Sequence, residues 1–272
     1  MLTLTASLLL SLNSAPCISL AGSIAGRADV SQERYAQLAE PFHAVGGLGG
    51  MGTGTLIADQ WVVTAAHVAD FLRLRGHDPI VFTLDDGREF EVDRVVIHPR
   101  WIPFEKQMAT RGEDELFSPG DLALLHLSEV VEGVEPVPLG EYDDTNPEVM
   151  LVGIGAFVND PQNGVEGEEM MSMERGTKHA GTNRIDRVDR RRKELVLSFT
   201  APGEEGVTQD EASAFAGDSG GPIVAKIGEV WSVIGVMASV EADNDTLGDY
   251  GDETHATSIG AARKWIDKQM AE

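Results

Sequence analysis

The chain has 272 residues, of which 45 are acidic and 21 basic, so its formal net charge is −24. A charge of this sign argues against nucleic acid and anionic membrane surfaces as partners, because both would repel the protein. With 42% hydrophobic residues, the chain can bury one large core or two smaller ones. Its 30 glycines and 12 prolines interrupt many short runs rich in Val and Ile, which favours a mostly β fold.

The first segment, residues 1–23, contains no charged side chain and ends in Ala21-Gly22-Ser23. Small residues at the first and third of these positions fit a signal-peptidase site, so we expect a signal peptide over residues 1–23 and a secreted protein, extracellular or periplasmic. The apolar part is shorter than the roughly 20 residues that a membrane-spanning helix needs. No membrane attachment is therefore expected after signal removal. The only cysteine, Cys17, lies in this segment, so the mature chain has no disulfide.

The next residues predict a short helix or extended arm and then several strands. Helical spacing over 31–41 predicts the helix or arm, and β-branched residues over 52–57 and 61–67 predict two strands. Residues 80–97 alternate apolar and polar around Asp86-Gly87, which predicts a hairpin with a tight turn. The segment 98–101 that follows is expected to be structural, and 102–118 is a long polar stretch.

The second half of the chain repeats this pattern of short strands. Apolar runs predict strands near 149–154, 194–199 and 233–240. The basic run 190–193 is interpreted as a solvated turn. Apolar residues at helical spacing over 260–267 predict a helix near the C-terminus.

Three segments carry residue types suited to nucleophilic catalysis. Thr64-Ala65-Ala66-His67 ends a β-branched stretch with an imidazole, Asp121 heads an alternating strand over 121–127, and Gly217-Asp218-Ser219-Gly220-Gly221-Pro222 sets a hydroxyl between glycines. A simple turn needs neither an acid nor a hydroxyl at fixed places, whereas a nucleophile beside free N–H groups does. In this His, Asp, Ser order, the three segments resemble the motifs of the chymotrypsin-like (trypsin-like, S1 type) serine proteases.

The resemblance covers about residues 24–270 and implies an all-β fold of two six-stranded antiparallel barrels followed by a C-terminal helix. Within a protease domain over 24–272, we expect the N-terminal barrel over about 40–135, the C-terminal barrel over about 136–258 and the helix over about 259–270. Where many members of the family have cysteines flanking the histidine region, this chain has Gly52 and Val68.

The resemblance also implies roles for single residues. Ser219 would be the nucleophile, His67 its general base and Asp121 the acid that orients the imidazole, while the N–H groups of Gly217 and Ser219 would form the oxyanion hole. This chemistry needs no cofactor or metal. We therefore expect a secreted, monomeric serine endopeptidase acting on protein or peptide substrates. The alternative is a trypsin-like binding or regulatory protein without turnover.

A second implication concerns the acid beside the nucleophile. Cleavage after Ser23 would leave the N-terminus Ile24-Ala25-Gly26-Arg27, which resembles the Ile-Val-Gly-Gly start of active family members. In the family, the freed amino group pairs with the acid before the nucleophile, here Asp218. Signal removal would then itself complete the site. The alternative is an exposed N-terminus and another partner for Asp218.

The residues expected to contact substrate depart from those of trypsin. Ser213 stands where trypsin has an aspartate at the base of the specificity pocket, and Ala238 and Val240 stand in the substrate-binding edge. Val240 in place of glycine would narrow the pocket, so we expect a small apolar residue before the scissile bond. Two alternatives stay open. Glu253 projecting into the pocket would favour a basic substrate residue, and His255 lining the pocket would favour an acidic one.

The acidic loop 241–253 raises the question of a bound calcium ion. Asp243, Asp245, Asp249 and Asp252 supply candidate oxygens, but Thr254 stands where an EF-hand needs a bidentate acid. We therefore expect no metal site.

Overall fold

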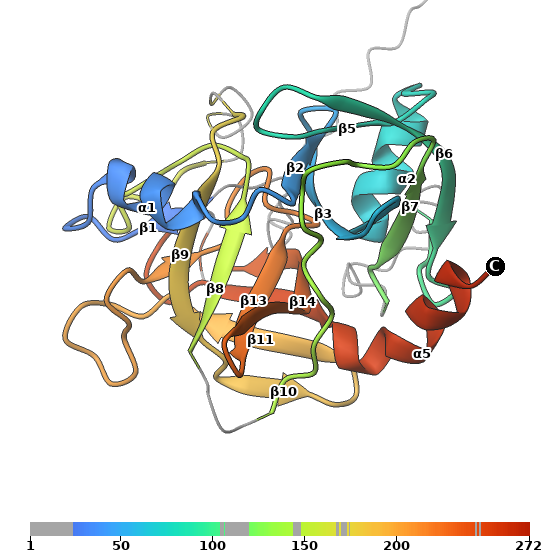
Figure 1. The fold of residues 1–272 in the computed structure, drawn as a ribbon. Helices are drawn as coiled ribbons and strands as arrows, with labels where there is room; N and C mark the ends of the chain where they lie inside the picture. The colour runs from blue at the N-terminus through green and yellow to red at the C-terminus, as the bar shows by residue number, and fades with distance from the viewer. Residues whose placement is uncertain are drawn as a thin grey trace, which may run out of the picture.

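The computed structural model describes residues 24–103, 106, 120–143, 148–166, 169, 173, 175–242, 244 and 246–272. The predicted signal peptide and most of the polar stretch 102–118 lie outside the described residues. The chain forms two β units side by side, and the last helix passes from the second unit back towards the first (Figure 1).

The first unit is a closed antiparallel barrel with the strand order β2-β3-β4-β7-β6-β5. Its strands are β2 (Val45–Leu48), β3 (Gly52–Ala58), β4 (Trp61–Thr64), β5 (Val81–Thr83), β6 (Glu89–Ile97) and β7 (Ala123–Leu127). Pairing of β2 with β5 closes the barrel. The predicted hairpin around Asp86-Gly87 is confirmed as β5 and β6.

The second unit is a seven-stranded sheet with the order β10-β11-β15-β14-β13-β8-β9. Its strands are β8 (Glu148–Gly153), β9 (His179–Arg184), β10 (Arg187–Asp189), β11 (Glu194–Ser198), β13 (Pro222–Ile227), β14 (Val230–Glu241) and β15 (Glu253–Ser258). The sheet is curled, but its two edge strands, β10 and β9, do not pair with each other, so it is not a closed barrel. Instead, the side-chain amide of Asn183 in β9 donates to the Ser198 carbonyl in β11 over 3.0 Å. The predicted chymotrypsin-like fold is confirmed, with this curled sheet as its second half.

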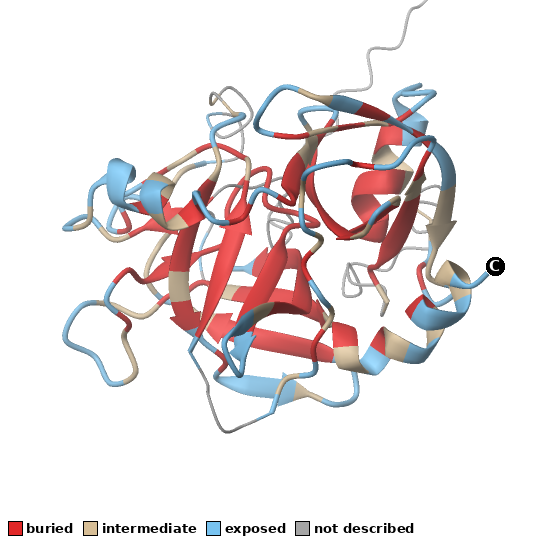
Figure 2. Ribbon diagram, in the orientation of Figure 1, coloured by how far each residue is buried: buried red, intermediate tan, exposed pale blue. Residues whose placement is uncertain are grey.

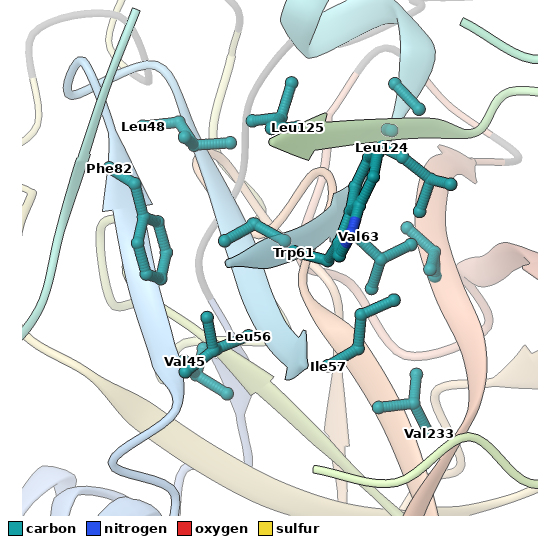
Figure 3. Close-up of a cluster of buried hydrophobic side chains, with 14 of the residues drawn as sticks. Val45, Leu48, Leu56, Ile57, Trp61, Val63, Phe82, Leu124, Leu125 and Val233 are labelled. Atoms are coloured by element: carbon teal, nitrogen blue, oxygen red, sulfur yellow. The ribbon is translucent and has the colours of Figure 1, made fainter. Parts of the chain in front are cut away.

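A continuous apolar core fills the barrel and extends to the second unit. Alternating strand residues such as Val45, Leu56 and Leu124 point inward and are fully buried. Val233 of β14 lies in the same cluster (Figure 3). Burial is concentrated on the strands of both units, while the connecting loops are largely exposed (Figure 2). The two halves therefore share packing at the boundary where the predicted catalytic segments meet.

Three helices flank these sheets in the described part of the chain: α1 (Gln32–Ala39), α2 (Ala66–Leu74) and α5 (Ile259–Met270). The predicted α1 and α5 are confirmed, and each begins after a serine whose hydroxyl accepts a main-chain N–H, Ser31 for α1 and Ser258 for α5. The sequence did not predict α2. No described helix has the length and apolar character to cross a membrane.

A short N-terminal strand, β1 (Ala25–Gly26), pairs antiparallel with β12 (Ala212–Ser213). Its position is fixed further by the Gly26 N–H, which donates to the Val158 carbonyl over 2.8 Å. The segment that begins the described chain is therefore built into the second unit, close to the loop that carries Ser219.

The predicted solvated turn at 190–193 is confirmed between β10 and β11. Asp189 Oδ1 accepts the main-chain N–H groups of Arg191 and Arg192, each over 2.8 Å. Lys193 has a φ of 70°, a left-handed conformation that reverses the chain here.

Candidate active site

His67 and Asp121 form a buried, hydrogen-bonded pair. His67 Nδ1 lies 2.6 Å from Asp121 Oδ2, and the His67 main-chain N–H donates to Asp121 Oδ1 over 2.9 Å. Only 7% and 8% of the two side chains are exposed. Because a carboxylate only accepts hydrogen bonds, the proton of a neutral imidazole lies on Nδ1, and Nε2 keeps a lone pair. The pair has the arrangement of a general base and its orienting acid.

The barrel brings these two residues together from segments far apart in sequence. β4 and β7 are antiparallel neighbours, with Thr64 opposite Ala123. The end of β4 therefore meets the start of β7, which places His67 in the first turn of α2 beside Asp121. From the second unit, Thr257 Oγ1 donates to the Asp121 carbonyl over 3.0 Å. Asp121 consequently lies at the boundary between the two units.

Trp101 packs beside this pair, although its segment was predicted only as structural. Its ring centre lies 6.4 Å from that of His67, and its Nε1 lies 3.3 Å from Asp70 Oδ2 in α2. Trp101 is itself only 8% exposed, so the indole is part of the buried surroundings of the His67 ring. The segment 98–101 did not predict this contact, because the contact depends on how β6 leads into the following loop.

Ser219 lies in the loop between β12 and β13. Gly217 and Gly220 have φ angles of 114° and 86°, which glycine adopts without strain. A Cβ on Gly220 would collide with Thr64 Oγ1, so the loop needs glycine to lie against β4. Within the described residues, the main-chain N–H groups of Asp218 and Gly220 donate to carbonyls, whereas no such bond starts at Gly217 or Ser219. These two N–H groups are available to an incoming oxygen.

The loop that carries Ser219 contacts the first barrel next to the strand that leads to His67. The Ser219 carbonyl accepts the Thr53 N–H over 2.9 Å. Among the described hydrogen bonds, none joins the Ser219 hydroxyl to His67; such bonds often tighten only when substrate is present. The segments that carry Ser219 and His67 nevertheless meet at one junction between the two units.

Asp218, next to Ser219 in the chain, is fully buried. Its Oδ2 accepts the Phe215 N–H over 3.1 Å, while Oδ1 has no partner among the described residues. Burial raises the pKa of this carboxyl well above its usual range, because desolvation penalises the charged form. Ile24 is also fully buried, and its neighbour Ala25 packs in one cluster with Phe215. The Ile24 segment thus lies against the residues that lead into Asp218.

A narrow pocket adjoins Ser219 and has room for about one water molecule. Its walls come from the loop that carries Ser219, from β14 and from the loop after β14: Ala214, Phe215, Ser219, Met237, Ala238, Ser239, Val240 and Leu247. Most of these side chains are apolar. Of the residues expected to contact substrate, Ala238 and Val240 line this pocket.

Ser213, Glu253 and His255 do not line the pocket in the described structure. The Ser213 hydroxyl is buried and lies 2.8 Å from Thr254 Oγ1. Glu253 accepts two hydrogen bonds from Arg187, over 2.8 and 3.0 Å. His255 Nδ1 lies 3.2 Å from Glu194 Oε2. These partners hold Glu253 and His255 in an ion-pair network on another face of β15.

The same network contains the one group of metal-ligating side chains found among the described residues, Glu241, Glu253 and His255, whose ligand atoms lie within 4.8 Å of one another. Arg187 binds Glu253 through both oxygens, and Arg192 lies 3.5 Å from Glu241. The two guanidinium groups therefore already neutralise the carboxylates, and a cation would have to compete with them.

Of the four aspartates weighed as calcium ligands, Asp243 and Asp245 lie outside the described residues. Asp249 Oδ1 accepts the Gly164 N–H over 2.9 Å, and Asp252 Oδ2 accepts the Gly248 N–H over 2.7 Å. Both carboxylates thus serve as acceptors for the loop main chain.

Glu211 is another buried carboxyl, and burial raises its pKa despite hydrogen bonds from Thr208 and Thr200.

Comparison with known proteins places the chain in a family. Residues 29–266 match the family model described as Trypsin. The Complement C1s subcomponent of Sus scrofa is 32% identical over 114 residues, 37% of this chain and 15% of that protein. Complement C2 of Mus musculus is 37% identical over 87 residues, 29% of this chain and 11% of that protein. The Complement C1s subcomponent of Rattus norvegicus is 26% identical over 243 residues, 81% of this chain and 32% of that protein. The chain spans a third or less of the length of these relatives.

Proposed function

Because the chain belongs to the trypsin family, we propose that it is a serine endopeptidase in which Ser219 attacks the substrate carbonyl. The observation that carries this proposal is the bond of 2.6 Å between His67 Nδ1 and Asp121 Oδ2. It leaves Nε2 as the proton acceptor at the junction where the Ser219 loop lies. A member of the family that had lost catalysis would have no need to hold the imidazole in this tautomer.

The proposed reaction uses only side chains and main-chain groups of this protein. His67 Nε2 takes the Ser219 hydroxyl proton as Oγ bonds to the carbonyl carbon, and Asp121 stabilises the imidazolium that forms. The N–H groups of Gly217 and Ser219 hold the negative oxygen of the tetrahedral intermediate. The imidazolium then protonates the leaving amine, and water hydrolyses the acyl-enzyme by the same steps.

The proposed preference is for a small apolar residue before the scissile bond. The small size and apolar walls of the pocket beside Ser219 support it, with Val240 and Leu247 limiting the space. Cleavage of a mixed peptide library should show Ala or Val enriched at this position. Enrichment of Lys or Arg would contradict the proposal.

We also propose that the amino group of Ile24, freed by signal removal during secretion, pairs with Asp218. The buried Ile24, and Asp218 Oδ1 without a described partner, support this pairing, since a buried carboxylate needs a cation to remain charged. The N-terminal sequence of the secreted, active protein should begin at Ile24. Full activity in a protein beginning elsewhere would contradict the pairing.

Labelling with a fluorophosphonate probe tests the proposed chemistry directly. The probe reacts with a serine only when an organised base and oxyanion hole activate it. The processed protein should take up the label and hydrolyse peptides, and Ser219→Ala should lose both while keeping its folded circular dichroism spectrum. Absence of labelling in folded, processed protein would favour the alternative of a binding or regulatory protein.

A further inference from the structure

Thr53 in β3 bonds through its main-chain N–H and its hydroxyl to the proposed nucleophile loop, residues 214–221. Its main-chain N–H donates to the Ser219 carbonyl over 2.9 Å. Its hydroxyl donates to the Gly217 carbonyl over 2.6 Å and accepts the Ile154 N–H over 3.2 Å. Thr53 is fully buried. One residue of the first barrel therefore bonds to the loop on both sides of Asp218.

The same residue also connects this loop to the strand that leads to His67. Thr64, at the end of β4, donates its hydroxyl to the Thr53 carbonyl over 2.8 Å. His67 follows Thr64 by three residues in the chain. A continuous path of short hydrogen bonds therefore runs from the strand before the proposed base, through Thr53, to the carbonyl of the proposed nucleophile.

No covalent link strengthens this junction. Gly52 packs directly on Val68, and a Cβ at Gly52 would lie 2.7 Å from Val68 Cγ1 and 3.0 Å from the Ser219 carbonyl oxygen. The space between β3, α2 and the nucleophile loop is thus filled by small apolar groups. The relative position of base and nucleophile depends here on packing and on the hydrogen bonds of Thr53 and Thr64.

We propose that Thr53 is a positioning residue whose hydroxyl holds the Gly217 carbonyl, and with it the oxyanion-hole loop, in the geometry needed for catalysis. This inference rests on the proposed serine endopeptidase function.

The main chain on either side of Gly217 shows why this hydroxyl matters. The Ala216 carbonyl accepts the Ala156 N–H over 3.1 Å, and in a trans peptide this directs the Gly217 N–H to the opposite side. The Thr53 hydroxyl fixes the following peptide through the Gly217 carbonyl. Glycine itself offers little resistance to rotation of these peptides. Without the hydroxyl, Gly217 has lost one of the two anchors that set the direction of its N–H.

The decisive variant is Thr53→Val, which keeps the shape and main-chain bonds but removes the hydroxyl. Thr55→Val is a matched control, because Thr55 is a fully buried threonine of the same strand whose hydroxyl has no partner among the described residues. Thr53→Ser restores the hydroxyl without the methyl group. All variants are compared with the parent processed protein for kcat, KM, fluorophosphonate labelling rate and unfolding midpoint.

We expect Thr53→Val to lower kcat and the labelling rate by about 10-fold to 100-fold, as small misplacements of catalytic groups do. Its KM should change by less than about twofold, because the pocket walls are untouched. Thr53→Ser should recover most of kcat, and Thr55→Val should keep it. Assays run well below the unfolding midpoint separate this effect from a loss of folded protein.

Several outcomes would overturn the inference. Equal kcat for Thr53→Val and the parent would do so, as would an equal loss in Thr55→Val or a failure of Thr53→Ser to restore activity. If Thr53→Val does not fold, Thr64→Val tests the same path, and unchanged kcat and labelling in that variant would count against it. A parent protein that is neither labelled nor active would instead contradict the proposed function itself, and the inference with it.

Discussion

The buried carboxyl of Asp218 makes the stability of the unprocessed protein depend on pH in a predictable way. When residues precede Ile24, its nitrogen is an uncharged amide, and Asp218 Oδ1 has no described donor to offset its burial. Burial raises the pKa of Asp218 well above 3.8. Asp218→Asn keeps a similar shape and cannot ionise, so comparing the two proteins isolates this one titration.

The sign and size of the effect follow from proton linkage. Between pH 3.8 and its raised folded-state pKa, Asp218 is protonated in the folded chain and ionised in the unfolded one. The folded state then binds more protons, so the unfolding free energy falls as pH rises, by up to about 1.4 kcal/mol per pH unit. This loss is absent below the ordinary pKa. Asp218→Asn should therefore gain stability over the parent as pH increases through the window.

Urea denaturation from pH 4 to pH 8 measures the difference. Both proteins should keep residues before Ile24 and carry Ser219→Ala to prevent self-cleavage. Thr55→Val, which removes a buried hydroxyl but no titratable group, is the control and should run parallel to its parent. Parallel curves for Asp218→Asn and its parent would refute the reasoning. In protein beginning at Ile24, the difference in unfolding free energy between Asp218→Asn and its parent should be smaller, because the amino group would stabilise the carboxylate.

Three further substitutions test the site and its supports. Asp121→Asn should lower kcat by about 10³-fold to 10⁴-fold in a peptide assay, because the amide favours the wrong tautomer of His67; a loss below tenfold would argue against the assigned role. Val240→Gly should shift kcat/KM towards larger side chains before the scissile bond by about tenfold or more, and an unchanged preference would show that Val240 does not limit the pocket. Tyr35→Phe removes a hydroxyl that donates to the Glu211 carbonyl over 2.8 Å, and should lower the unfolding free energy by about 1–3 kcal/mol in urea titrations while leaving kcat unchanged; equal stability would mean that water replaces the hydroxyl.

The predicted elements that proved correct are those with strong local signals. Periodicity and a serine cap are properties of a few neighbouring residues, so α1 and α5 could be identified without knowledge of the rest of the chain. The hairpin around Asp86-Gly87 is likewise set by its own turn. In contrast, α2 was missed, because its residues continue directly from a β-branched strand and Ala65 provides no side-chain cap.

In the candidate site, too, residues marked by a local motif could be predicted, whereas contacts between distant segments could not. His67, Asp121 and Ser219 each stand in a short motif whose residue types suggest a role. Trp101 stands in a segment expected only to be structural, and its contact with the His67 ring arises only when the chain after β6 meets α2. Leu247 reaches the pocket from a loop whose course could not be predicted from composition. The partners of Glu253 and His255 were also unpredictable, since they come from two other segments of the chain.

By itself, the sequence determined a mostly β composition, and three short motifs that resemble those of the chymotrypsin-like serine proteases indicated the fold and three candidate catalytic residues, because such motifs are encoded within a few residues. The tertiary structure alone decided that Thr53 bonds to Gly217, 164 positions away. It also decided which side chains line the pocket beside Ser219. Such contacts depend on strand register and on how the closed barrel meets the curled sheet, and pairings over this range leave no periodic signal in the chain.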